Sequence, residues 1–190
     1  MKRILALTMA AAMAACVPTM TAAPAGAFDP GTGLTVNLQN SWTHVPANLN
    51  GAVNGSVLTR HGLALERVDI LSIEPGQSLI RVPREVDAPE FRAGMSEPEL
   101  VELVTSSLSR IGFTDLAAED VRAYQMAGAP GVRFALTGKY ASGLHMRGDA
   151  ALAESGGKLN VILFLAPAAH YYDANANEID ALIQSARFSR

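Results

Sequence analysis

The sequence predicts an α+β fold in which helices cover a largely antiparallel β-sheet. Four segments with strand character follow one another from residue 121, and short glycine-containing turns separate them. Two other segments, residues 96–112 and 168–186, carry apolar residues at helical spacing. Short turns join antiparallel neighbours, so we expect one antiparallel sheet with the helices packed on its faces.

The first half of the predicted domain contains a strand, an irregular segment and a hairpin. Residues 34–38 alternate between apolar and polar side chains and predict the first strand. Residues 39–55 hold Trp42 among asparagines and glycines, which indicates an irregular segment pinned by the indole ring. Residues 56–73 predict a hairpin with its turn at His61-Gly62, because glycine tolerates a positive φ.

The clearest helix begins at Ser96. Ser96 and Glu99 have the spacing of a capping box, Pro98 lies in the first turn, and Gly112 can end the helix. The apolar residues at helical spacing are Leu100, Leu103, Val104, Leu108 and Ile111.

The four later strands are predicted at residues 121–126, 132–140, 144–152 and 159–165. The fourth is apolar on both faces, so we expect it to be central and covered by helices on both sides. The third places His145, Arg147 and Asp149 on one face. A cation in that row favours an Arg–Asp pair on a solvated face over a metal site.

The N-terminus carries an export signal. Lys2 and Arg3 precede an uncharged apolar run, residues 4–15, which is shorter than the roughly 20 residues of a membrane-spanning helix but typical of a signal peptide. Met13-Ala14-Ala15-Cys16 resembles a bacterial lipobox. That resemblance implies that residues 1–15 form a lipoprotein signal peptide and that Cys16, the single cysteine, carries diacylglycerol and palmitate.

A second processing route stays open. Ala25-Gly26-Ala27 also satisfies the small-x-small rule, and a cut after Ala27 would release a soluble periplasmic protein that starts at Phe28. If Cys16 is lipidated, Val17 in place of aspartate implies, by the lipoprotein resemblance, an outer-membrane anchor that faces the periplasm.

The mature chain is predicted to be a tether followed by one domain. Residues 16–32 are rich in alanine, proline, threonine and glycine and predict a flexible tether, while residues 33–190 have the length of a single globular domain. The formal charge is −3, and removal of Lys2 and Arg3 makes it −5. No basic patch is visible, which disfavours nucleic-acid binding, so membrane contact would rest on Cys16.

The order of elements is strand, hairpin, helix, four-strand meander and helix. With the Trp42 region, the capped helix at Ser96 and the segment LFLAPAAHYYD before the last helix, this order resembles the PsbP-like group of α/β/α sandwich domains over residues 34–188. The resemblance implies a binding or assembly module with a partner in the cell envelope, and it brings no shared catalytic residues.

No sequence motif indicates catalysis, a metal or another cofactor. The chain lacks a Gly-x-Ser-x-Gly elbow and a Ser-x-x-Lys pair, and its histidines lack metal-ligand spacing. The alternative is a small periplasmic hydrolase or a metal- or ligand-binding enzyme. It requires at least two of the four histidines to meet an aspartate or glutamate in one cleft. These are His44, His61, His145 and His170.

A candidate patch for partner binding combines His170, Tyr171 and Tyr172 with Trp42. Tyrosine and tryptophan offer rigid contact area with a polar tip, which suits recognition. The same rings also suit a structural role, in which the tyrosines pack at the start of the last helix and Trp42 anchors the core. The sequence leaves both interpretations open.

Overall fold

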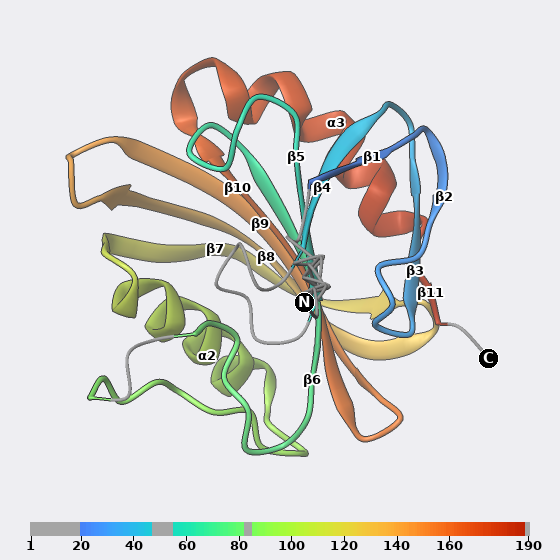
Figure 1. Cartoon of the computed structure of the whole chain (residues 1–190). Helices are drawn as coiled ribbons and strands as arrows, with labels where there is room; N and C mark the ends of the chain where they lie inside the picture. The colour runs from blue at the N-terminus through green and yellow to red at the C-terminus, as the bar shows by residue number, and fades with distance from the viewer. Residues whose placement is uncertain (1–19, 47–54, 82–84, 189–190) are drawn as a thin grey trace, which may run out of the picture.

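A computed structural model describes residues 20–46, 55–81 and 85–188, and this part of the chain forms two β-sheets and two α-helices (Figure 1). The larger sheet contains β1 (Thr21–Ala23), β4 (Trp42–Pro46), β5 (Gly55–Thr59), β6 (Arg67–Ile73), β7 (Phe113–Met126), β8 (Ala129–Tyr140), β9 (His145–Ser155) and β10 (Lys158–Pro167). The smaller sheet contains β2 (Gly26–Phe28), β3 (Leu34–Leu38) and β11 (Arg187–Phe188). The helices are α2 (Glu97–Arg110) and α3 (Asp173–Gln184), and a kinked turn, η1 (Ala168–Tyr172), precedes α3.

The larger sheet is antiparallel throughout, in the order β1-β4-β5-β6-β10-β9-β8-β7. The predicted meander of four successive strands is confirmed as β7 to β10. Strand β10 lies between β6 and β9, where Leu163 pairs with Asp69 on one side and Ala150 on the other. Every β10 residue after Lys158 is buried, which confirms the prediction of a central strand covered on both faces.

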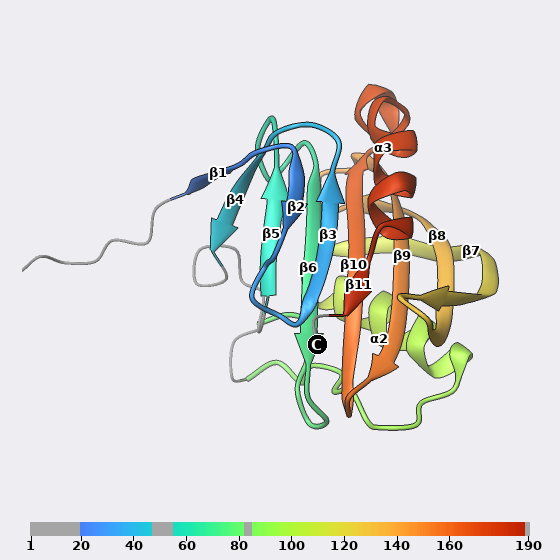
Figure 2. The ribbon, with the colours of Figure 1, turned by 90° about the vertical axis from the view of Figure 1, so that its right-hand side faces the viewer.

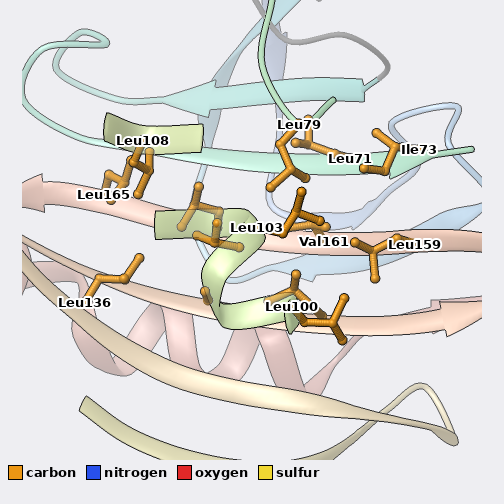
Figure 3. Close-up of a cluster of buried hydrophobic side chains, with 14 of the residues drawn as sticks. Leu71, Ile73, Leu79, Leu100, Leu103, Leu108, Leu136, Leu159, Val161 and Leu165 are labelled. Atoms are coloured by element: carbon orange, nitrogen blue, oxygen red, sulfur yellow. The ribbon is translucent and has the colours of Figure 1, made fainter. Parts of the chain in front are cut away.

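Helix α2 covers one face of the sheet. Its predicted capping box is present, with the Glu99 carboxylate accepting a hydrogen bond from the Ser96 backbone N–H at 2.8 Å. That bond lowers the pKa of Glu99. The apolar stripe of the helix packs on β6 and β10 (Figure 3). The residues in this contact include Leu100, Leu103, Val104 and Leu108 of α2 and Leu71, Ile73, Val161 and Leu165 of the sheet.

Helix α3 and the three-stranded sheet share the opposite face (Figure 2). Ile179, Leu182 and Ile183 of α3 enter one cluster with Ile162 and Phe164 of β10. Leu34, Val36 and Leu38 of β3 complete this cluster. The fold is thus a mostly antiparallel sheet with one helix on each face, and the smaller sheet supplies cover that the sequence assigned to helices alone.

The predicted tether at residues 16–32 differs from the structure. Strand β1 pairs with β4, placing Ala23 opposite Trp42, and β2 pairs with β3. Ala23 is 2% exposed in the α3-side cluster. The folded domain therefore begins by Thr21, before the predicted boundary at residue 33. The composition of this segment concealed its strands because their hydrogen-bond partners lie later in the chain.

The segment at residues 39–55 was also wrongly predicted as irregular where the structure describes it. Residues 42–46 form β4, which sends Trp42 and Val45 to opposite faces of the sheet. The predicted β5–β6 hairpin is confirmed, but a loop replaces its two-residue turn. The buried Glu66 carboxylate closes this loop by accepting hydrogen bonds from the backbone N–H groups of Arg60, at 2.7 Å, and His61.

Strand β7 begins eight residues earlier than the predicted residue 121. Its register shifts twice along β8, and Asp115 and Asp120 at these irregularities both have φ of 52°. Bulges of this kind break the two-residue alternation on which the sequence prediction depended.

Gly148 of β9 leaves no room for a side chain next to β10. A Cβ at this position would lie 2.5 Å from the Phe164 carbonyl oxygen, which is fixed in the central strand. We expect Gly148→Ala to lower the free energy of unfolding by about 1–3 kcal/mol through overpacking, measured by urea denaturation. Gly138→Ala is the matched control. Its Cβ would lie 3.0 Å from a movable Leu116 methyl and 3.1 Å from the Thr114 carbonyl oxygen, against 2.5 Å for the clash at Gly148, so it should cost less. Equal losses would contradict the steric explanation.

Candidate functional site

Trp42 is a buried anchor between β4 and α3. Trp42 is only 3% exposed, and its Nε1 donates a hydrogen bond to Glu178 Oε1 at 2.9 Å. The Arg60 guanidinium carbon lies 4.2 Å from the ring centroid, within the range of a cation–π contact. Trp42 therefore offers no open ring face to a partner, and of the two roles the structure places it in the structural one.

Glu178 is the centre of the polar cluster around Trp42. Its two carboxylate oxygens each lie 2.9 Å from Nη2 of Arg60, and Asn40 donates a further hydrogen bond at 3.1 Å. Burial alone would raise the pKa of Glu178, but the hydrogen bonds from Arg60, Asn40 and Trp42 and the Arg60 charge lower it. The cluster holds α3 against the start of the domain.

Two histidines lie beside Tyr171. The Tyr171 ring centroid is 5.8 Å from that of His61 and 5.2 Å from that of His170. His170 and His61 are exposed, and Tyr171 is half-buried. We call His61, His170 and Tyr171 the imidazole–tyrosine patch. The sequence singled out His170 and Tyr171, but the β5–β6 loop that brings His61 to them is a long-range contact without a local signal.

The imidazole–tyrosine patch has a carboxylate neighbour that is already engaged. His61 Nδ1 lies 2.9 Å from Glu66 Oε2, while Glu66 Oε1 accepts the two backbone bonds that close the loop. The residue Glu66 is 1% exposed. Glu66 therefore holds the β5–β6 loop in the conformation that places His61 beside Tyr171.

Tyr172 lies beneath Arg147 at the edge of the α3-side core. Its ring stacks on Phe164 with centroids 5.7 Å apart, and the Arg147 guanidinium carbon lies 4.0 Å from the ring centroid. Burial is the main cause that raises the pKa of the Tyr172 hydroxyl. Tyr172 thus serves packing at the start of α3.

The row predicted on the third strand forms different pairs. Asp149 binds Arg133 of the neighbouring strand, with 3.0 Å between its Oδ1 and Arg133 Nε, and Arg147 binds Asp173 at 3.1 Å. Arg133 also reaches Asp180 of α3 at 2.7 Å. Arg133 is 5% exposed and the Asp149 side chain 18% exposed, so this pair is largely removed from solvent, while the Asp180 side chain is 47% exposed. Burial would lower the pKa of Arg133, but the two aspartates raise it.

The other two histidines lie on different strands. His44 of β4 lies between Thr21 Oγ1 at 3.3 Å and Ser56 Oγ at 3.0 Å, and burial lowers its pKa. His145 is exposed at the start of β9. In the part of the chain that the structure describes, no three His, Cys, Asp or Glu residues lie close enough to hold a metal ion.

Two adjoining cavities open on the α2 face, where sequence reasoning placed no site. The larger has a volume of about 260 Å³ and lies between the β5–β6 loop, the end of α2 and the ends of β8 and β9. The smaller, of about 90 Å³, lies under α2. Arg67, Ile111 and Leu165 line both cavities. The sequence of β6, RVDILSI, contained a signal for this site. Its alternation places the charged residues Arg67 and Asp69 on the same strand face as the apolar Leu71 and Ile73.

Arg67 and Asp69 form an ion pair at these cavities. Arg67 Nε donates to Asp69 Oδ2 at 2.8 Å, and Nη2 donates to Oδ1. The side chains are 24% and 6% exposed. Burial would lower the pKa of Arg67, but the charge and hydrogen bond of Asp69 raise it, so the guanidinium stays charged.

Comparisons with known proteins identify the fold. No family model and no curated protein matches the chain. Among solved structures, the chain is similar to the cyanobacterial PsbP protein CyanoP from Synechocystis sp. PCC 6803, with a TM-score of 0.51 and 14% sequence identity. The match covers 96% of this chain and 98% of that one. The fold is therefore PsbP-like, as the order of elements predicted.

No helix in residues 20–46, 55–81 and 85–188 has both the length and the apolar composition needed to cross a bilayer.

The Glu178 cluster predicts a pH-dependent stability. Glu178→Gln keeps the side-chain shape but removes the charge that faces Arg60, and we expect it to lower the free energy of unfolding by about 1–3 kcal/mol at pH 7. The folded-state pKa of Glu178 lies below its ordinary value of 4.5. The difference between wild type and variant should therefore be constant above pH 4.5 and shrink as the pH falls through the lowered pKa.

Urea denaturation over a pH series measures this difference. Glu102→Gln, an exposed change on α2, is the control and should have little effect at any pH. A difference that grows on acidification would contradict the proposed role of the Glu178 charge.

Proposed function

We propose that this protein is a lipid-anchored component of the bacterial cell envelope whose PsbP-like domain acts as a non-catalytic binding or assembly module. The observation that carries the proposal is the likeness to CyanoP across 96% of the chain, because the PsbP-like resemblance implies such a module. The lipobox residues Met13–Cys16 supply the proposed anchor, and Val17 favours the outer membrane, facing the periplasm.

The first strand begins at Thr21, closer in sequence to Cys16 than the predicted boundary at residue 33, and this shortens the proposed link to the membrane. Thr21 in β1 is five residues after Cys16. Five extended residues span at most about 18 Å. A lipid on Cys16 would therefore hold the β1 edge of the sheet close to the bilayer surface, which favours partners that are themselves at the membrane.

The structure supports processing at Cys16 over the alternative after Ala27. A cut after Ala27 would remove β1 and leave only Phe28 of β2. It would also remove Ala23, which packs in the α3-side cluster beside Trp42. Processing at Cys16 keeps the whole described sheet.

The polar groups of the described domain favour binding over catalysis. His44 and His145 lie on separate strands. His61 and His170 meet at Tyr171, but the neighbouring Glu66 carboxylate accepts the backbone bonds that close the loop. The three carboxylates of α3 that meet arginines serve to hold the helix. For partner contact we propose His170 and Tyr171, extended by His61 and bordered by Tyr172, while the buried Trp42 supports the fold beneath them.

The anchor is tested by labelling cells with a fatty-acid analogue. We expect the wild-type protein to incorporate the label and Cys16→Ala to lose it completely, since the thioether bond requires the thiol. Ala27→Leu, which blocks the alternative cut at an exposed position, should keep full labelling. Label retained in Cys16→Ala would refute lipidation at this residue.

The partner surface is tested by site-specific photocrosslinking in the native envelope. A photoreactive residue in place of His170 should capture one defined envelope protein. The same residue in place of Val121, which is 47% exposed on the edge strand β7, is the control and should not capture it. Capture of the same protein with equal yield from both positions, or from neither, would contradict the assignment of this surface.

A further inference from the structure

The two α2-face cavities differ in the chemistry of their walls. The larger is lined mainly by apolar side chains, with Tyr140 and Ser142 as its hydroxyl groups. Its other contributors besides Arg67 are Leu63, Ala64, Ile111, Phe113, Leu144, Met146 and Leu165. The smaller one contains Asp69, Ser107 and the exposed Arg81 among its apolar walls. Arg67 lines both, so one cavity offers an apolar space and the other offers polar groups at its end.

Ser107 carries a buried polar group that the fold does not use. The residue is 1% exposed on the inner side of α2, and its hydroxyl has no hydrogen-bond partner among the described residues. An unpaired buried hydroxyl is unfavourable. A ligand oxygen in the smaller cavity would give this group a partner.

Arg67 has donors to spare. The guanidinium carries five N–H groups, and Asp69 takes one from Nε and one from Nη2. The structure gives its other N–H groups no partner within residues 20–46, 55–81 and 85–188. Arg67 and Ser107 thus line the same small cavity, one from the sheet and one from the helix, and each has an unused hydrogen-bonding group.

We infer that the α2-face cavities bind a small uncharged amphiphile whose apolar part fills the larger cavity and whose single hydroxyl or carbonyl oxygen lies between Arg67 and Ser107. The volume sets the size: since a cavity of about 150 Å³ admits benzene, one of about 260 Å³ admits about ten non-hydrogen atoms. The charge sets the class. Asp69 already pairs with Arg67, and the other cation of the smaller cavity, Arg81, is exposed, so water screens its charge. A carboxylate beside Arg67 would therefore lie next to the buried Asp69 carboxylate with only weak compensation.

This inference goes beyond the proposed envelope role and does not depend on the lipid at Cys16. The test is a methyl-NMR titration of the full-length protein with 1-octanol. We expect saturable shifts of the Leu63, Leu144 and Met146 methyl signals. Octanoate at pH 7, which has the same chain length but a charged end, should bind at least about fivefold more weakly, the equivalent of one neutral hydrogen bond.

Variants locate the site. Ala64→Phe fills the margin of the larger cavity from an exposed loop position and should abolish the saturable shifts. Ala117→Phe, also at an exposed alanine, lies on β7 outside both cavities and should leave octanol binding unchanged. Ser107→Ala should weaken binding about fivefold through the lost hydrogen bond. It should leave the melting temperature equal to or above that of wild type, because it removes an unpaired buried group.

Three results would overturn the inference. Shifts that do not saturate, or that persist unchanged in Ala64→Phe, would show that these cavities are not the binding site. Octanoate binding more tightly than octanol would refute an uncharged ligand. Because the methyl signals and the Ser107→Ala melting temperature do not depend on export or on a partner protein, failure here is distinct from failure of the envelope proposal.

Discussion

The central strand β10 imposes the constraint on which the rest of the structure depends. Because both of its faces are apolar and it lies in the middle of the sheet, both faces must be covered. Helix α3 buries only a narrow apolar stripe and does not cover its face alone. The strands β2 and β3 therefore pack beside it, and β1 extends the sheet. The chain from Thr21 onward is consequently part of the folded sheet, and Ala23 is buried in the α3-side cluster.

Charged pairs determine how α3 sits on that face. Its carboxylates meet arginines from three separate elements, the β5–β6 loop, β8 and β9. The pairs are Glu178 with Arg60, Asp180 with Arg133, and Asp173 with Arg147. Glu178 and Arg133 are largely buried, whereas the Asp173–Arg147 pair is exposed. A buried ion pair contributes little net stability but penalises any orientation that leaves its charge unpaired, and an exposed pair contributes little of either. The pairs therefore specify the position of α3. Because these carboxylates are engaged in ion pairs with arginines, they hold the helix in place.

Local signals predicted the fold where neighbours in sequence are also neighbours in space. Patterns among residues close together in sequence predicted the capping box of α2, the meander β7 to β10 and strand β3. Strands β1, β2 and β4 were missed because they are short and owe their order to distant partners, as in the pairing of Thr21 with His44. The Asp149 pair was missed for a related reason. Its partner Arg133 is on the adjacent strand, where side chains approach more closely than two positions along one strand.

Strand β6 contributes side chains to both faces of the sheet and forms part of the cavity walls. Successive side chains of a strand point to opposite faces. Arg67 and Asp69 therefore line the α2-side cavities, while Val68 and Ile70 lie in the α3-side core. The cavity floor is formed by the same backbone that pairs with β10. The fixed backbone of β6 and the two hydrogen bonds to Asp69 restrict the position of the Arg67 guanidinium. A site built in this way has already met the ordering cost of binding when the domain folds.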